Sequence, residues 1–205
     1  KLFVDLLANA DSYFYFLNQL SVAEKQNLVQ CFSYYQTVFE KEFKEAGLPD
    51  ELKYFAPALS AMNTKAVGKF RRAGIWQLTH FQGILNDLNV SRLVDERLNM
   101  ELATKAVVGQ LKKNTELFNS SELAVLGYLA GNTKLRDSIH RVGKSVSIAE
   151  LLKQLPPEIS ETIAAYQALS VFLSVNRFIP DGHSIDLDEV VKQYIELYEK
   201  VLSKK

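Results

Sequence analysis

Apolar residues recur at intervals of three and four along most of this 205-residue chain, which is the period of an α-helix. The first clear run follows Ser21, and Ser21 with Glu24 forms the S-x-x-E pattern of a capping box. Gly47 ends the run, as a glycine that follows the last turn of a helix commonly does. The pattern therefore predicts a helix over residues 22–46.

A second helix is expected over residues 50–60, with Pro49 at its start and acidic residues in its first turn. Pro57 should kink or end this helix, because proline lacks the N–H that an inner turn needs. A loop is expected over residues 67–72. Later apolar runs predict helices over residues 74–88, 100–114, 121–131, 155–175 and 188–203. Strand signals are weak, so the sequence predicts an all-α fold with eight or nine helices.

The charge balance argues against two classes of partner. Lys+Arg and Asp+Glu both number 24, so the formal net charge is zero, and there is no basic block. Neither nucleic acid nor an anionic membrane surface is therefore expected as the main partner. One cysteine, Cys31, leaves no internal disulfide, and no apolar run approaches the ~20 residues of a membrane span. The histidines His80, His140 and His183 are scattered without ligand spacing, so neither a metal site nor a cofactor is expected.

Several short motifs occur in a characteristic order. They are GLPDEL at residues 47–52, Ser60, AGIWQ at 73–77, DER at 95–97, GYLAG at 127–131 and LPPEISETIAAY at 155–166. In this order and spacing they resemble the lytic transglycosylases, in particular the membrane-bound type D group with its goose-lysozyme-like SLT domain. The resemblance covers roughly residues 47–170.

The resemblance implies a lysozyme-like helical domain with extra helices at both ends. We expect an N-terminal helical extension over residues 1–46, packed on the domain. The lytic-transglycosylase-like domain itself should cover residues 47–175. A turn and a helix over residues 176–205 should close the chain.

Leu59 occupies the position at which the resemblance implies the catalytic glutamate, directly before Ser60. Enzymes of this kind cleave peptidoglycan between N-acetylmuramic acid and N-acetylglucosamine with one carboxyl group, which acts first as acid and then as base. Leucine can do neither. Glu51 would lie about 12 Å away along a helix, and residues 60–77 contain no acid. A replacement would have to come from another helix, and the candidates are Asp95, Glu96 and Glu101.

A second position departs from the family in the same direction. The resemblance implies an asparagine that orients the substrate's N-acetyl group, directly after Tyr128, but the chain has Leu129 there. Leu59 and Leu129 should face the same cleft, so its floor is predicted to be apolar. Burial of each leucine would contribute about 1.5–3 kcal/mol.

Four residues are candidates for binding substrate: Ser60, Trp76, Gln77 and Tyr128. Trp76 and Gln77 would form a wall on which an indole stacks against sugar and an amide bonds hydroxyls. The alternative is a core tryptophan and a helix-capping glutamine. Tyr128 either touches the ligand or packs in the core, and Ser60 either contacts it or bonds at a helix end.

Three hypotheses follow from these residues. The first is a catalytically inactive lytic-transglycosylase-like protein of the periplasm or cell envelope, which binds peptidoglycan glycan or acts as a scaffold or regulator with other envelope proteins. The second is an active transglycosylase that uses a substitute acid. The third is a protein-interaction domain whose cleft is filled by side chains.

Overall fold

The computed structural model describes residues 2–3, 17–143 and 147–175, and in this part of the chain helices are joined by turns and loops. The α-helices are α2 (Val22–Glu45), α3 (Phe55–Ser60), α4 (His80–Leu85), α5 (Met100–Phe118), α6 (Ser121–Ala130), α7 (Asn132–Val142), α8 (Ile148–Gln154) and α9 (Pro157–Val175). Short 3-10 helices cover Asp50–Tyr54 (η2), Lys69–Arg71 (η3) and Glu96–Leu98 (η4). No strand occurs among the described residues, which confirms the all-α prediction. The helix expected over residues 188–203, and the segment 176–205 as a whole, lie outside the described residues.

Both ends of α2 follow the sequence signals. The Ser21 side chain accepts a bond from the Glu24 backbone N–H, and the Glu24 side chain accepts one from the Ser21 N–H, so the predicted capping box is confirmed. At the other end Gly47 adopts φ +69°, and the next N–H, of Leu48, donates to the Phe43 carbonyl at 3.0 Å. This bond pattern is a Schellman motif, so the predicted helix stop at Gly47 is also confirmed.

The helix expected over residues 50–60 forms in two consecutive parts, and Pro57 does not end it. The chain forms η2 first and changes to α3 at Phe55. Pro57 then stands in the first turn of α3, where its missing N–H has no helical partner to lose. The helix therefore changes from 3-10 to α geometry two residues before the proline and continues through Pro57 to Ser60.

The prediction of one helix over residues 74–88 is wrong in its first third. Gly74 and Gln77 adopt φ +78° and +51°, and the backbones of Ala73 and Leu78 bond each other across a tight turn. A Cβ on Gly74 would lie 1.8 Å from the Arg97 carbonyl oxygen, so a distant segment fixes this turn. Thr79 then caps the much shorter α4. Helices α7 and α8 were not predicted, although Ser147 and Glu150 form a capping box at the start of α8.

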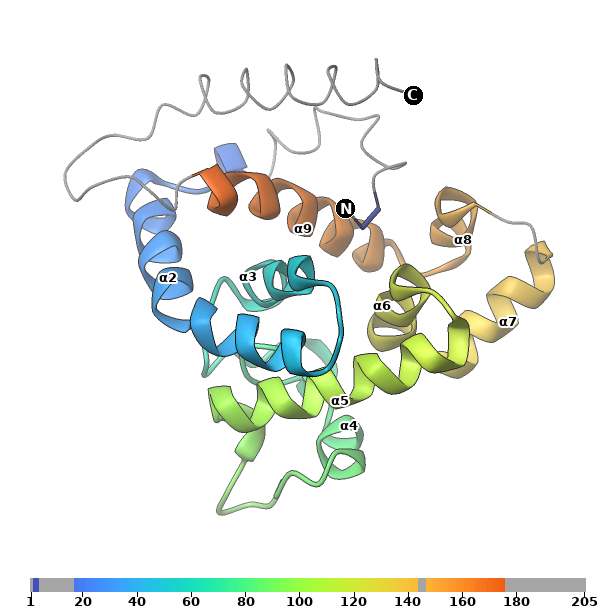
Figure 1. Cartoon of the computed structure of the whole chain (residues 1–205), viewed down its shortest axis with the longest axis horizontal. Helices are drawn as coiled ribbons and strands as arrows, with labels where there is room; N and C mark the ends of the chain where they lie inside the picture. Colours follow the sequence, from blue (N-terminus) through green and yellow to red (C-terminus); the bar gives the residue numbers. More distant parts are fainter. Residues whose placement is uncertain (1, 4–16, 144–146, 176–205) are drawn as a thin grey trace.

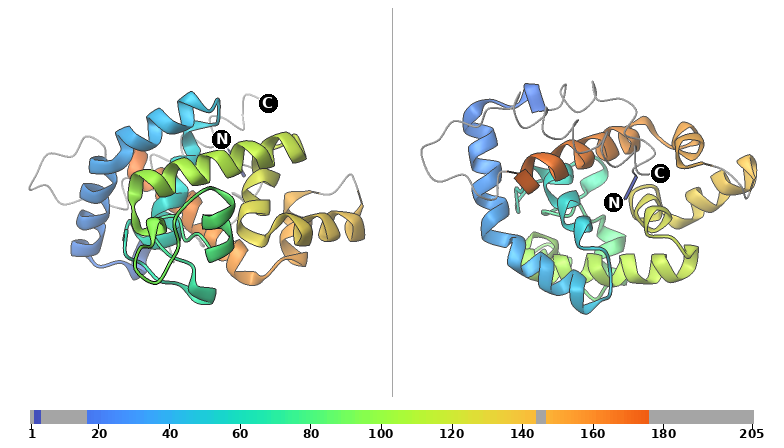
Figure 2. Two further views of the ribbon diagram at one scale, coloured as in Figure 1. Left: turned by 90° about the horizontal axis from the view of Figure 1, so that it is seen from below. Right: turned by 45° about the horizontal axis from the view of Figure 1, so that its top comes forward.

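The core gathers around α3, which lies between α9 and α5 in Figures 1 and 2. Phe55 of α3 stacks on Tyr166 of α9, with ring centroids 4.0 Å apart. On another side, Phe39 and Phe43 of α2 pack edge-on against Trp76. Helix α2 thus shares the core of the segments that follow it.

Lys53 is a charged residue inside this core. Its side chain is fully buried, and its Nζ lies 2.5 Å from both Glu40 of α2 and Asp50 of η2. The two carboxylates neutralise the ammonium, which burial alone would strongly disfavour. This cluster ties η2 to α2, directly before α3 begins.

Candidate functional site

The end of α3 places the first of the two leucines. Ala61 and Met62 adopt φ +49° and +65°, so the helix ends directly after Ser60. The Ser60 hydroxyl donates to the Ala56 carbonyl at 3.1 Å, which is the bonding at a helix end that one interpretation expected. Leu59 is held half-buried just before this end.

The end of α6 places the second leucine beside Tyr128. The Tyr128 hydroxyl donates to the Trp76 backbone carbonyl, and its side chain is buried. Burial raises the pKa of Tyr128, so the phenol stays protonated at neutral pH. Leu129, the next residue, is 7% exposed.

Leu59 and Leu129 line one hollow, which we call the Leu59 groove, with a volume of about 470 Å³. Apolar walls come from Ala130, Pro156 and Ile159. Lys69, Arg72 and Lys134 make its polar lining basic, and Glu158 is the carboxylate among the lining residues. The groove is therefore an apolar floor with a mainly positive rim.

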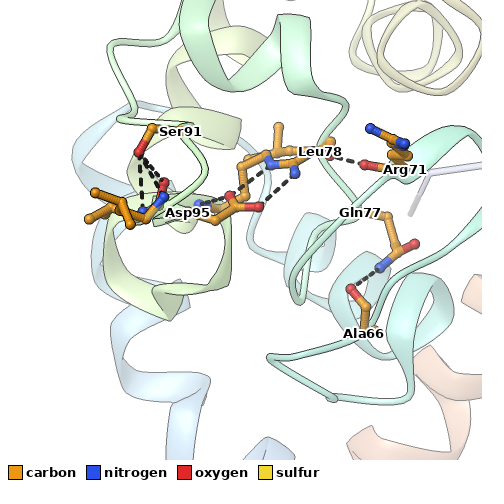
Figure 3. Close-up of polar contacts among 9 residues, drawn as sticks. Ala66, Arg71, Gln77, Leu78, Ser91 and Asp95 are labelled. Carbon is orange, nitrogen blue, oxygen red and sulfur yellow. Dashed lines mark hydrogen bonds and ion pairs between the residues drawn. The ribbon is translucent and has the colours of Figure 1, made fainter.

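The loop before α4 forms one wall of this groove and is internally braced. Gln77 donates from Nε2 to the carbonyls of Gly74 at 2.9 Å and Ala66 at 3.3 Å, and Figure 3 shows its amide turned toward Ala66. Arg72 reaches across to α6 and donates to the Leu129 carbonyl at 2.9 Å. These bonds fix the loop against the end of α6.

Only one of the four predicted substrate-binding residues lines the Leu59 groove. Gln77 lines the Leu59 groove, whereas Ser60, Trp76 and Tyr128 are not among its lining residues. Trp76 is 1% exposed, and its indole N–H donates to the Thr104 hydroxyl at 2.9 Å. Trp76 therefore has no free face for a sugar ring in this structure, and Gln77 braces the loop rather than capping a helix.

None of the three expected substitute acids lines the Leu59 groove. Asp95 pairs with Arg97 at 2.6 Å beside a different hollow. Glu96 accepts a bond from the Asn89 N–H, and Glu101 lies in the first turn of α5.

Glu158 is a site residue that sequence reasoning missed. It is exposed in the first turn of α9, and only the packing of that helix brings it to the groove. The LPPEISETIAAY block contained it, so that motif was the available signal.

The described residues contain neither a metal-binding cluster nor a helix that could span a membrane. No three side chains of the metal-ligating types come together there. No helix in the described ranges combines the length and apolarity needed to cross a membrane.

The helical architecture, with a groove between the end of α3, the loop before α4 and the end of α6, defines a lysozyme-like all-α domain. Residues 36–151, more than half of the chain, match the family described as the Transglycosylase SLT domain, and the chain belongs to this family. The match begins within α2, upstream of the domain start expected at residue 47, and that boundary stays a prediction. The closer likeness to the membrane-bound type D group also stays a prediction. No curated protein sequence matches the chain significantly.

Proposed function

We propose that this SLT domain binds the glycan strand of peptidoglycan in the cell envelope without cleaving it. The observation that carries the proposal is the position of Leu59 and Leu129 on the lining of one groove. These are the positions at which the family resemblance implies the catalytic acid and the asparagine that orients the substrate. The domain would then hold or guide wall strands, as a scaffold or regulator for other envelope proteins.

Loss of cleavage is expected because cleavage of a glycosidic bond needs an acid. The leaving glycosidic oxygen needs a proton donor within hydrogen-bond reach. Leu59 has no transferable proton, and Tyr128 directs its hydroxyl to the Trp76 carbonyl inside the core. Neither Leu59 nor Tyr128 therefore supplies the acid.

Binding is supported by the charge and shape of the groove. Lys69, Arg72 and Lys134 would face a ligand that carries carboxylates on its stem peptides, or on the lactyl group where no peptide is attached. Phe70 lines the same groove and is 84% exposed, so its ring offers a flat apolar surface to a sugar. The groove's volume speaks against the hypothesis of a cleft filled by side chains.

Glu158 favours one second candidate, which is slow cleavage with Glu158 as the substitute acid. It lines the groove from the start of α9, across from the end of α3. Cleavage products that appear with the wild-type chain and vanish in Glu158→Gln would establish this candidate in place of the first.

The binding proposal is tested by co-sedimentation with purified sacculi. The double variant Lys69→Ala/Lys134→Ala should be retained at least about tenfold more weakly, because each charged hydrogen bond contributes about 1.5–3 kcal/mol. Lys112→Ala/Lys113→Ala removes the same charge from the exposed surface of α5 and serves as the matched control. Equal retention of both double variants, or no retention of the wild-type chain, would contradict the proposal.

A further inference from the structure

A second hollow lies on the other side of the Lys69–Arg72 loop from the Leu59 groove. Its volume is about 500 Å³, and its polar lining includes Arg71, His80, Arg92, Asp95 and Arg97. We call it the Arg71 hollow. With His80 neutral, these side chains leave two positive charges in excess.

One wall of the Arg71 hollow is a fixed ion pair. Arg97 is 7% exposed and donates to both carboxylate oxygens of Asp95, at 2.9 and 2.6 Å. Its remaining nitrogen donates to the carbonyls of Arg71 at 2.8 Å and Leu78 at 3.0 Å; Figure 3 shows Asp95, Leu78 and Arg71 around this network. The Asp95 charge is thus neutralised internally by Arg97.

The same network holds Arg71 in an unfavourable backbone conformation. Phe70 and Arg71 adopt φ +56° and +55°, a region that costs non-glycine residues about 1–2 kcal/mol each. The Arg97 bond to the Arg71 carbonyl offsets this cost. In this backbone conformation Phe70 lines the Leu59 groove, whereas Arg71, the next residue, lines the Arg71 hollow.

The guanidinium groups of Arg71 and Arg92 have no carboxylate partner in the described part of the chain. The ion pairs there join Lys53 to Glu40 and Asp50, and Arg97 to Asp95. Both free arginines line the Arg71 hollow together with His80. The net charge of the chain is zero because this local positive excess is balanced by acidic residues elsewhere.

We propose that the Arg71 hollow binds a phosphate group, held by the guanidinium groups of Arg71 and Arg92 and by the ring of His80. A planar guanidinium donates two parallel hydrogen bonds to a phosphate, which fits this group better than a small halide. The site is separate from the Leu59 groove and does not rest on the proposed glycan binding.

The phosphate group has two chemical sources, a soluble phosphate compound or a phospholipid headgroup. Leu93, which follows Arg92, is 96% exposed, and Phe81, which follows His80, is 68% exposed. Apolar side chains in these positions would contact the acyl region beneath a bound headgroup. A soluble phosphate would make no use of them.

The test has two arms. Calorimetry with pyrophosphate and with inorganic phosphate, at an ionic strength fixed by chloride, measures the soluble source. Co-sedimentation with phosphatidylglycerol/phosphatidylethanolamine vesicles, compared with phosphatidylcholine vesicles, measures the lipid source. The variant is Arg71→Gln/Arg92→Gln, which keeps the Arg71 carbonyl, and the matched control is Lys112→Gln/Lys113→Gln.

Saturable binding in either arm that weakens at least tenfold in the arginine variant, and not in the lysine control, supports the site and identifies its source. In the vesicle arm, Leu93→Ser should lower binding as well. Unchanged melting temperature and sacculus retention in the arginine variant show that its fold and the Leu59 groove are intact. No saturable binding in either arm, or equal binding by the arginine and lysine variants, overturns the proposal.

Discussion

At the scale of single residues, the account depends on two leucines at positions where the family resemblance implies polar groups for glycan cleavage. Leu59 and Leu129 come from the ends of α3 and α6 and line one groove. Their position on the same groove agrees with the expectation from the sequence that Leu59 and Leu129 face a common cleft. The rest of the wall is braced by Gln77 and Arg72, so the groove keeps its shape without the two polar residues.

Restoring both groups should restore cleavage. We predict that Leu59→Glu/Leu129→Asn releases 1,6-anhydro-muropeptides from sacculi, detected by mass spectrometry. The variant should lose about 2–4 kcal/mol of stability, because two partly or wholly buried apolar side chains are replaced by polar ones. The control Leu59→Gln/Leu129→Asn has the same shape and no acid. Equal product release by this control would contradict the assigned role of position 59.

We predict that Trp76 stabilises the fold and does not contact the glycan. Thr104→Val leaves the buried indole N–H without its acceptor, which should lower the free energy of unfolding by about 1–3 kcal/mol in urea titrations. Thr104→Ser keeps the hydroxyl and should cost less. Sacculus retention by the folded Val variant should be unchanged. Weakened retention at unchanged stability would instead make Trp76 part of a sugar-binding wall.

At the scale of elements, the turn at Gly74–Gln77 decides the shape of the loop between the two hollows. Gly74→Ala adds a methyl group 1.8 Å from the Arg97 carbonyl oxygen, in a backbone region already unfavourable for alanine. We predict a loss of more than about 3 kcal/mol, as for other overpacked and strained sites. Gly47→Ala has a similar φ of +69° and no atom within 4 Å, so it should cost only about 1–2 kcal/mol. Equal losses, measured by chemical denaturation, would contradict this account of the turn.

The Arg97–Asp95 pair should give the fold a pH dependence. Hydrogen bonds from Arg97 hold the pKa of the Asp95 carboxyl below its ordinary value. Such a group stabilises the fold above the unfolded pKa of about 4, and this contribution is lost as the pH falls through the lower, folded pKa.

Asp95→Asn should therefore lower stability at pH 7 by about 2–4 kcal/mol, since it leaves the buried Arg97 charge unpaired. The gap to the wild-type chain should close as the pH is lowered below about 4. Asp137→Asn, on the exposed surface of α7, should leave stability nearly unchanged. A stability gap that stays constant with pH would argue against the ion pair as its cause.

The elements also show what the sequence could and could not predict. Ser21, Glu24 and Gly47 determine the ends of α2 through bonds to their own neighbours, so the sequence signals were sufficient. The turn at Gly74 depends on contact with Arg97, which is distant in sequence, and the apolar pattern alone suggested a helix there. Glu158 was missed for the same reason, because the packing of α9 brings it to the groove.

At the scale of the whole molecule, two basic hollows lie on either side of one short loop in a chain without net charge. Lys69, Phe70 and Arg72 turn toward the Leu59 groove, and Arg71 turns toward the other hollow. The prediction that an anionic surface is not the main partner was made from the net charge. Net charge does not show where charged side chains gather on the surface. The fold thus separates the groove proposed to bind glycan from the hollow proposed to bind phosphate, and we predict that each activity can be removed without the other.

The most direct test incubates the wild-type chain with purified sacculi and measures two quantities in the same sample. These are the protein retained in the pellet and the 1,6-anhydro-muropeptides released into the supernatant. The account predicts saturable retention, with release no higher than in a sample without protein. Time-dependent release of anhydro-muropeptides would contradict the loss of cleavage, and absence of retention would contradict glycan binding.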